Sequence, residues 1–334
     1  MPTDRPTAVL AMGAEVAEAL FPPGLRRRLT ASFAPDPVEL NGSLTTPGAR
    51  AALAGADILI TGWRCPPLTA EVLAAAPRLR AVIHAAGTVK SLVTQAVWER
   101  GVAVSSAADA NARPVADFTV AAITLAAKKA LPTAARYRDG WPSFAEREGA
   151  YGRSVGIIGA SRIGRRVIAR LASSGNDTRI LLSDPYVSRA DAEALGARLC
   201  DLDELCRSSS IVSVHAPKLP ETHQLLDARR LALVPDGGTV INTSRGTLVD
   251  TEALAGECAT GRLNAFLDVT DPEPLPPGHA LLKLPNVLVT PHIAGAQGSE
   301  VSRLGLYAIE EAERWIRGEP LHGAITAAEL TRLA

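Results

Sequence analysis

Short apolar runs alternate with longer amphipathic, alanine-rich stretches over nearly the whole chain. In the first hundred residues, four runs have the length and composition of buried strands: 7–12, 56–61, 79–85 and 102–105. From residue 154 onward the alternation repeats, with predicted strands at 154–158, 179–183, 211–214, 239–242, 264–268 and 287–290. Strands separated by helical patterns are typical of parallel sheets built from βαβ units. Because one sheet of that many strands would be very wide, the pattern predicts two α/β domains.

Two long helical patterns connect the two series of strands. Residues 113–138 run apolar to Ala130, with Asn111 as a candidate cap and Pro114 suited to a first helical turn. We expect this helix to lead from the first series into the second. Residues 297–317 have apolar side chains at a helical period and are expected to pack back on the first series. The predicted domains are therefore a discontinuous one, 1–105 with 296–334, and a continuous one, 106–295.

Composition excludes several classes of protein. The chain has 334 residues, 47% of them hydrophobic, and its 35 basic and 35 acidic side chains give a net charge of zero, so nucleic acid or an anionic membrane is not expected as a partner. No stretch approaches the roughly 18 apolar residues that span a bilayer, and the N-terminus does not resemble a signal peptide. The four cysteines form no CxxC pair, which favours a reduced, cytoplasmic setting without a metal site.

The stretch VGIIGASRIGR, residues 155–165, is similar to a dinucleotide-binding turn. Gly159 and Gly164 occupy the first and third glycine positions, which permit the tight turn and the close packing of helix on strand. Ser161 occupies the second position, where a Cβ would crowd the phosphate or widen the turn, although its hydroxyl can donate to a phosphate oxygen. The helix starting at Arg162 points free N–H groups at the same place.

An acidic residue supports this interpretation. Asp184 lies 20 residues after Gly164, at the end of the next predicted strand, where a carboxylate can bind the ribose hydroxyls of a dinucleotide. Its charge would repel a 2′-phosphate, which favours NAD over NADP. The alternative is an ordinary βαβ turn whose glycines are steric, but the strand, the helix and the spaced aspartate together favour a cofactor.

Three polar stretches follow predicted strands of the second series, at 242–246, 268–273 and 290–295. Since the carboxyl ends of parallel strands line the ligand crevice of such a sheet, Arg245, Glu273 and His292 can converge there. Arg245 would hold a substrate carboxylate, His292 would transfer the hydroxyl proton, and Glu273 would fix the tautomer of the imidazole. Singly, they could be an ion pair, a solvated carboxylate and a satisfied histidine. Together they predict oxidation of an alcohol beside a carboxylate, with hydride passing to a nicotinamide.

Residues from about 56 to 318 resemble the D-isomer-specific 2-hydroxyacid dehydrogenases. The resemblance rests on VGIIGASRIGR, SDP, HAPKLPET, INTSRG, LDVTDPEPLP and NVLVTPHIAG, of which the last three in this order are highly specific. It implies two Rossmann-like α/β domains, a flavodoxin-like substrate domain and an NAD-binding doubly wound parallel sheet, with the active site in a cleft between them. It also implies a homodimer formed through the NAD-binding domains.

The resemblance assigns a role to each matching position. Arg245, Glu273 and His292 match the catalytic trio, and Asp268 matches the carboxylate that contacts the nicotinamide amide. The substrate carboxylate would be bound by Ala85, Ala86 and Gly87 together with Arg245 and His292. The implied cofactor-binding residues are Gly159, Ser161, Arg162, Ile163, Gly164, Asp184, His215, Ala216, Pro217, Thr243, Asp268, His292 and Gly295.

Two stretches depart from the family pattern. Lys90 and Ser91 stand where relatives often carry Asp-Asn, so Lys90 either meets a second anionic group on the substrate or is a solvated lysine near a helix start. Trp63 and Arg64 follow another strand of the first series and either border the substrate or are a core tryptophan with an exposed neighbour. These departures bear on the identity of the substrate, while the reaction type is unaffected.

The sequence therefore predicts an NAD-dependent enzyme that transfers a hydride between NAD(H) and a small 2-hydroxyacid or 2-oxoacid. The resemblance implies specificity for the D-isomer, and we expect the enzyme to work mainly as a 2-oxoacid reductase. Phosphite oxidation on the same fold is one alternative, whereas formate oxidation is disfavoured because glutamate, not glutamine, stands at position 273. Another alternative is an NAD(H)-sensing interaction protein like the corepressors that keep this fold, although no appended tail or basic patch suggests one.

Overall fold

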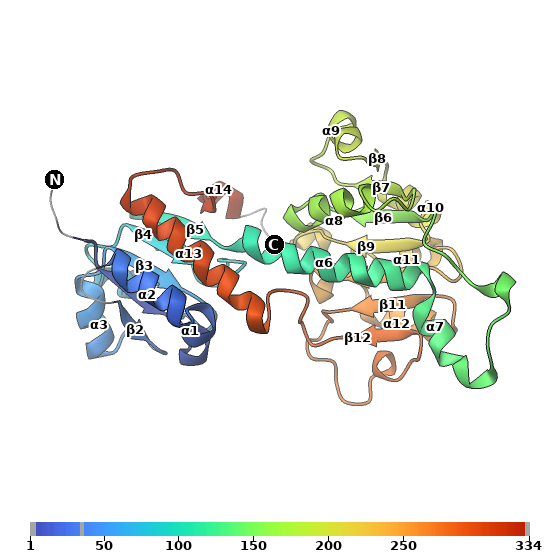
Figure 1. Cartoon of the computed structure of the whole chain (residues 1–334), viewed down its shortest axis with the longest axis horizontal. Coiled ribbons are helices and arrows are strands. Elements are labelled where there is room, and N and C mark those ends of the chain that lie inside the picture. The colour runs from blue at the N-terminus through green and yellow to red at the C-terminus, as the bar shows by residue number, and fades with distance from the viewer. Residues whose placement is uncertain (1–4, 34–36, 331–334) are drawn as a thin grey trace. The chain divides into compact units, whose positions relative to one another are not determined.

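A computed structural model of the chain describes residues 5–33 and 37–330. It contains two compact units, the first formed by residues up to Asn111 and from Ala296 onward, the second by Ala112–Gly295. In Figure 1 the first unit is drawn from blue to teal and again in red at the C-terminal end, and the second unit from teal through green and yellow to orange. The first boundary lies later than position 105 because helix α6 (Ala108–Ala127) begins in one unit and continues into the other. Which ligand each unit binds stays a prediction.

The first unit is a parallel sheet with one antiparallel edge strand. Its order is β13-β5-β4-β3-β1-β2, and β13 runs antiparallel to β5. The central strands are buried on both faces because alternate side chains enter two cores, one beneath α1, α2 and α13 and one beneath α3, α4 and α5. The strands are β1 (Ala8–Ala11), β2 (Val38–Leu40), β3 (Ile58–Thr61), β4 (Ala81–His84), β5 (Ala103–Ser106) and β13 (Ala324–Ile325). The helices are α1 (Ala14–Leu20), α2 (Pro23–Ser32), α3 (Pro47–Ala54), α4 (Ala70–Ala74), α5 (Gln95–Glu99), α13 (Val301–Ile316) and α14 (Ala327–Leu330), with a 3-10 turn at Gly298–Glu300.

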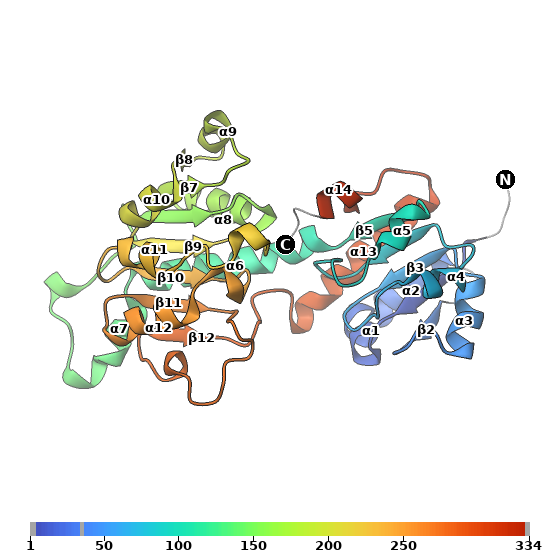
Figure 2. The same cartoon turned by 180° about the vertical axis from the view of Figure 1, so that it is seen from behind.

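The second unit is an all-parallel sheet in the order β12-β11-β10-β9-β6-β7-β8. Helices α6 and α8 cover one core and α10, α11 and α12 cover the other, as the two views show (Figures 1 and 2). The strands are β6 (Ser154–Ile158), β7 (Arg179–Ser183), β8 (Arg198–Leu199), β9 (Ile211–Val214), β10 (Thr239–Asn242), β11 (Asn264–Leu267) and β12 (Val287–Val289). The helices are α6, α7 (Ala130–Ala135), α8 (Arg162–Ala172), α9 (Arg189–Ala194), α10 (Leu202–Ser208), α11 (Ala228–Leu233) and α12 (Thr251–Ala259). Short 3-10 helices lie at Tyr137–Asp139, Phe144–Glu146, Pro220–Thr222, Gly246–Leu248 and Ala280–Leu282.

Both sheets are doubly wound, which matches the predicted α/β class. In the first unit β1 lies between β2 and β3, and in the second β6 lies between β7 and β9, so the strand order reverses at β1 and at β6. Ligands of open α/β sheets bind outside the carboxyl ends of the strands at such a reversal. The turn after β6 is therefore placed where a cofactor site is expected.

The helix predicted over 113–138 is wrong in its bounds. Helix α6 ends at Ala127, and Lys129, with a left-handed φ of 52°, separates it from α7. The Ser106 hydroxyl accepts the Ala108 N–H at 3.3 Å, so the helix starts directly after β5 and Pro114 lies inside it. Asn111 is not the cap, because its side-chain oxygen accepts the N–H of Ala296 at 2.9 Å.

Within residues 5–33 and 37–330, no helix has the length and apolar character needed to cross a membrane. The same residues contain no cluster of histidine, cysteine and acidic side chains that could hold a metal ion. All four cysteines are free thiols, and burial raises the pKa of Cys65, Cys206 and Cys258 to about 12.

Candidate active site

The turn after β6 requires glycine at two of its three fingerprint positions. Gly159 has φ +95°, and a Cβ there would lie 2.8 Å from the backbone nitrogen of Ala216 on the neighbouring strand end. A Cβ at Gly164 would overlap the carbonyl oxygen of Gly159, so helix α8 packs directly on the turn. The first and third glycines therefore have the steric roles that the sequence pattern assigned to them.

Ser161 occupies the second position without backbone strain. Its φ of −63° and ψ of 177° are ordinary for an L-residue, and its Oγ accepts the Gly164 N–H at 3.3 Å as the N-cap of α8. As an acceptor in this cap, the hydroxyl still has its own hydrogen to donate. The serine thus begins the helix whose N-terminus faces the candidate phosphate site. A hydrogen bond from this hydroxyl to a pyrophosphate stays a prediction.

Asp184 lies beside the same turn, at the end of β7. Its Oδ2 accepts the Ala160 N–H at 2.7 Å and its Oδ1 accepts the Tyr186 N–H at 2.8 Å. Each carboxylate oxygen can accept a second hydrogen bond, so a pair of hydroxyl groups can still bind there. The carboxylate is fixed in place before any ligand arrives.

The ends of β9 and β10 line the other side of this turn with neutral polar groups. His215 is buried, its Nε2 lies 2.9 Å from the Ser213 hydroxyl, and burial lowers its pKa to about 3, so the ring is neutral. Its Nδ1 is buried without a hydrogen-bond partner in the described part of the chain. Thr243 is also buried, with its hydroxyl 2.8 Å from that of Thr119. A glycine cradle beside an unsatisfied buried nitrogen fits a bound dinucleotide.

Arg245 follows β10 in a turn held by Asn242. The Asn242 amide donates to the carbonyl oxygen of Arg245 at 2.8 Å and its oxygen accepts the Ser244 N–H at 3.0 Å. Burial lowers the pKa of the Arg245 guanidinium, and the charge of Glu273 opposes that shift. A Cβ at Gly246 would overlap the carbonyl of Thr270, so the loop carrying Arg245 packs directly on the loop that leads to Glu273.

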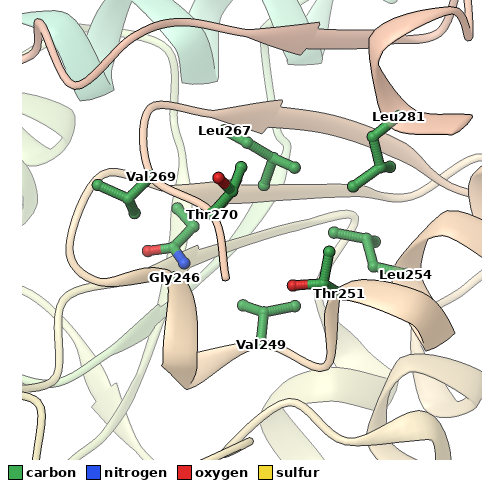
Figure 3. Close-up of a pocket in the computed structure, with 9 residues that line it drawn as sticks. Gly246, Val249, Thr251, Leu254, Leu267, Val269, Thr270 and Leu281 are labelled. Carbon is green, nitrogen blue, oxygen red and sulfur yellow. The ribbon is translucent and has the colours of Figure 1, made fainter. Parts of the chain in front are cut away.

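A small pocket lies behind this contact between loops (Figure 3). Aliphatic side chains such as Val249, Leu254 and Leu281 line much of it, together with Gly246 and Thr270. None of the side chains proposed for catalysis or cofactor binding lines it. It is therefore not the proposed substrate site.

Glu273 and His292 form a direct pair. The Nδ1 atom of His292 lies 2.6 Å from the Oε1 atom of Glu273, and both side chains are about half exposed. Because Nδ1 is taken by the carboxylate, Nε2 is the nitrogen left to exchange a proton with a ligand. The structure therefore brings together two members of the predicted trio and places the Arg245 loop against the loop of the pair.

Asp268 lies at the end of β11 and is 2% exposed. Its Oδ1 accepts the Thr290 hydroxyl at 2.6 Å and the Ile293 N–H at 2.8 Å, and its Oδ2 accepts the Ala294 N–H at 2.9 Å. The carboxylate thus holds the turn that carries His292. The last residue of the second unit, Gly295, ends this turn.

The loop after β4 in the first unit only partly matches the expected carboxylate site. Ala85 extends the strand, since its N–H donates to the Thr61 carbonyl at 2.7 Å, which corrects the expectation that this amide is available to substrate. Ala86 and Gly87 stay candidates. Sequence reasoning missed the buried pair beneath the loop, in which the His84 Nδ1 lies 2.9 Å from the Thr61 hydroxyl and burial lowers the His84 pKa to about 4.

The two departures from the family pattern lie on the surface of the first unit. Trp63 is 38% exposed and is therefore not a core tryptophan. Arg64 has a left-handed φ of 68° and forms an ion pair with Glu15. Lys90 is exposed, and its N–H donates to the Thr88 hydroxyl at 3.4 Å. Their contribution to substrate selection stays a prediction.

Residues 120–294 match the family model described as D-isomer specific 2-hydroxyacid dehydrogenase, NAD binding domain. The chain belongs to this family, as the sequence motifs predicted. It is 36% identical over 280 residues to a D-3-phosphoglycerate dehydrogenase of Mycobacterium tuberculosis, with 82% of this chain and 52% of the relative covered. It is 34% identical over 261 residues to a glyoxylate reductase of Korarchaeum cryptofilum, with 76% of this chain and 78% of the relative covered.

Solved structures give the same fold. A phosphoglycerate oxidoreductase from Rhizobium etli superposes with a TM-score of 0.80 at 25% identity, covering 97% of this chain and 98% of its own. The apo D-mandelate dehydrogenase of Rhodotorula graminis superposes with a TM-score of 0.81 at 24% identity, covering 96% and 98%. The predicted architecture of two Rossmann-like domains is confirmed by these neighbours. The chain spans about half the length of the curated phosphoglycerate dehydrogenases that it matches.

Proposed function

We propose that this protein is an NAD-dependent D-2-hydroxyacid dehydrogenase that works mainly as a 2-oxoacid reductase. The observation that carries the proposal is the 2.6 Å pair of His292 and Glu273 beside the Arg245 loop, on a unit that matches the NAD-binding domain of the family. Names of the relatives, among them glyoxylate reductase, support reduction of a 2-oxoacid. They do not favour phosphite oxidation or a corepressor role.

NAD(H) fits the second unit at the turn after β6. The turn of Gly159, Ala160 and Ser161, with Arg162, Ile163 and Gly164 beginning α8, would hold the pyrophosphate through backbone N–H groups. Asp184 would accept hydrogen bonds from the ribose hydroxyls. The nicotinamide end would lie along the strand ends that carry His215, Ala216, Pro217, Thr243, Asp268 and Gly295. When bound, the cofactor supplies or accepts the hydride.

The protein's own groups then handle charge and proton. Arg245 binds the carboxylate of the 2-oxoacid through its planar guanidinium and polarises the carbonyl oxygen. His292 Nε2 gives its proton to that oxygen as it gains negative charge during reduction. Glu273 accepts the Nδ1–H, which fixes the ring orientation and stabilises the imidazolium form. Ala86 and Gly87 would offer backbone N–H groups to the substrate carboxylate, as the family resemblance implies.

The decisive experiment is a panel of 2-oxoacids, among them glyoxylate, hydroxypyruvate and longer homologues, assayed with NADH and with NADPH. We expect turnover with NADH, and a His292→Ala variant should lose about 10²–10⁴-fold in kcat while binding NADH unchanged. His279→Ala is the matched control, because His279 also pairs with a glutamate, Glu252 at 3.2 Å, but is not among the residues proposed for the site. NADH binding without turnover of any 2-oxoacid would contradict the proposal that this protein is a 2-oxoacid reductase.

We also propose that two copies associate through the segment 137–151 of the NAD-binding unit. Four aromatic side chains on it are 65–86% exposed: Tyr137, Trp141, Phe144 and Tyr151. Exposed aromatic clusters are typical of protein interfaces, where they supply much of the binding energy. Trp141→Ser should convert a dimer to a monomer in light scattering, whereas Leu282→Ser, at another exposed position, should not. A wild-type monomer would contradict the proposal.

The cellular location proposed is the cytoplasm, on the basis of the four free thiols. Alkylation of freshly lysed cells should label four cysteines after denaturation. Labelling of fewer than four cysteines, with the remainder labelled only after reduction, would indicate a disulfide and argue against a reducing compartment.

A further inference from the structure

The turn that carries His292 has an unusual backbone. His292 has φ +55°, in the left-handed region that L-residues with a Cβ rarely adopt. Such a conformation persists only where the surrounding structure holds it in place. The nearest candidates for that restraint are the residues at the ends of β11 and β12, which are adjacent parallel strands with Leu267 opposite Val289.

Asp268, the residue after β11, collects the amides of this turn. Its backbone carbonyl accepts the His292 N–H at 3.0 Å. Its carboxylate accepts the next two amides, those of Ile293 at 2.8 Å and Ala294 at 2.9 Å. Three consecutive N–H groups therefore point at one residue, which fixes the direction of the chain through His292.

Thr290, the residue after β12, holds Asp268 in turn. Its N–H donates to the Leu267 carbonyl at 2.8 Å, which anchors its backbone to the end of β11. Its hydroxyl donates to Asp268 Oδ1 at 2.6 Å, a short bond of the kind formed to ionised carboxylates. Oδ1 thus has one donor from the His292 turn and one from Thr290, so the rotation of the carboxylate is fixed from both sides.

We propose that Thr290 is a positioning residue for proton transfer, acting on His292 through the Asp268 carboxylate. This inference rests on the proposed function. Without the Thr290 hydroxyl, the carboxylate rotates, the amides of Ile293 and Ala294 lose their fixed acceptor, and the left-handed turn relaxes. The imidazole then shifts away from the orientation set by Glu273. Displacements of about 1 Å at a reacting group cost on the order of 10²-fold in rate.

This role separates from the one that family resemblance gives Asp268. A carboxylate that contacts the nicotinamide amide affects cofactor binding, whereas a carboxylate that holds the His292 turn affects the chemical step. The backbone of Thr290 bonds the end of β11 through its N–H, and its carbonyl shares the His292 N–H with Asp268 at 3.0 Å, contacts that a change of side chain leaves in place. In the described part of the chain, the Thr290 hydroxyl bonds only the Asp268 carboxylate. Its removal therefore tests the second role while leaving the acidic group in place.

The test compares Thr290→Val, which removes the hydroxyl at constant shape, with Thr290→Ser, which keeps it. Thr94→Val is the control, because Thr94 also donates its hydroxyl in a short bond to a distant segment, the Leu68 carbonyl at 2.6 Å, but lies in the first unit. Each variant is assayed for kcat and KM with the best 2-oxoacid, for NADH affinity by fluorescence, and for hydrogen exchange at the Ile293 and Ala294 amides in the free protein.

For Thr290→Val we expect a loss of about 10–100-fold in kcat, with the NADH Kd changed by less than about threefold. Exchange at the Ile293 and Ala294 amides should rise by about tenfold or more as their acceptor is lost. Thr290→Ser should stay within about threefold of wild type in every measurement, as should Thr94→Val at this site.

Three outcomes overturn the inference. Unchanged kcat and unchanged hydrogen exchange in Thr290→Val would show that the hydroxyl does not restrain the Asp268 carboxylate or the His292 turn. A loss of NADH affinity as large as the loss of kcat would show that Thr290 and Asp268 act in cofactor binding. A Thr290→Ser variant as impaired as Thr290→Val would make the effect one of packing. If the wild-type protein reduces no 2-oxoacid, the proposed function fails and positioning for catalysis fails with it, while faster exchange in Thr290→Val would still establish the restraint on the turn.

Discussion

The two units have the same doubly wound sheet but different first βα turns. After β1, Gly13 has an ordinary φ of −62° and caps the short helix α1. After β6, Gly159 has φ +95°, Gly164 lies against it, and the longer helix α8 begins between them. The second turn thus has the glycine geometry that lets a phosphate group approach the backbone closely at a helix N-terminus.

The next strand end repeats the contrast. Asn41 follows β2 in the first unit, at the place where Asp184 follows β7 in the second. A neutral amide and a carboxylate at equivalent positions suit different ligands, although the two sheets have the same doubly wound order around β1 and β6. The sheet therefore provides the place for a ligand, while a few residues at the strand ends decide which ligand binds.

The first prediction is that the two turns differ in how well they tolerate a glycine-to-alanine substitution. Gly164→Ala places a Cβ on the Gly159 carbonyl and should destabilise the protein by about 3 kcal/mol and abolish measurable NADH binding. Gly13→Ala makes one tight contact, with the flexible Arg64 side chain at 3.2 Å, and an ordinary one with Val16 at 3.5 Å, and should cost less than about 1 kcal/mol. Chemical denaturation and NADH titration measure both. Equal effects of the two substitutions would mean that the turns are not sterically different.

The second prediction concerns the edge strand of the first unit. Glu311 is 1% exposed and accepts hydrogen bonds from the Ser105 hydroxyl at 2.5 Å and from the His322 and Gly323 N–H groups at 3.0 and 2.9 Å. These bonds hold the segment leading to β13 against β5. Glu311→Ala leaves three donors unsatisfied and should cost about 3 kcal/mol of unfolding free energy.

Glu310→Ala, at an exposed neighbouring glutamate, is the control for the second prediction. Because β13 belongs to the first unit, NADH affinity of the second unit should not change in Glu311→Ala. A variant as stable as wild type would show that the carboxylate does not hold the edge strand.

The third prediction uses two buried histidines, one at the carboxyl end of a central strand of each sheet: His84 at the end of β4 and His215 after β9. Burial lowers the pKa of His84 to about 4 and that of His215 to about 3, below the ordinary value of about 6.5. At a pH between these lowered values and the ordinary value, the histidines bind protons in the unfolded chain but not in the folded chain. The free energy of unfolding therefore falls as the pH decreases. Each histidine should remove on the order of 2 kcal/mol between pH 7 and pH 5.

Urea denaturation across that pH range measures the effect. His84→Gln should flatten the pH dependence, while His223→Gln, at an exposed position, should leave it unchanged. A His84→Gln variant with the full wild-type pH dependence would show that this histidine does not stay neutral in the folded state.

The central strands could be predicted because both faces are buried and each strand is an uninterrupted apolar run. Three edge strands, β2, β8 and β13, could not, since each has only two or three residues and none is an uninterrupted buried run. The edge strand β12 was predicted because its three residues are all apolar. The start of α6 was missed because Asn111 looks like a cap in the sequence, whereas its amide bonds Ala296, far along the chain. Interactions between distant segments leave no local pattern.

The site shows the same division. The closeness of Glu273, His292 and the Arg245 loop could be predicted from residue types at strand ends, as could the steric roles of the two required glycines, while the catalytic roles of the three residues stay a prediction. Thr290 and the His84–Thr61 pair could not, because their roles come from the register of adjacent strands. Ser161 was predicted to donate to a phosphate, but its part as an acceptor in the helix cap appears only in the folded turn.

The smallest predicted effect is at Ser161, the residue that most distinguishes this turn from a three-glycine one. Ser161→Ala removes the acceptor of the Gly164 N–H and should cost about 1 kcal/mol, whereas Ser161→Gly should cost only a few tenths. If the hydroxyl also donates to the pyrophosphate, both variants should weaken NADH binding by about 3–10-fold. Ser173→Ala, near the other end of α8, serves as the control. Tighter NADH binding by Ser161→Gly would instead mean that the serine side chain obstructs the phosphate site, and that the turn binds the cofactor through its backbone and helix alone.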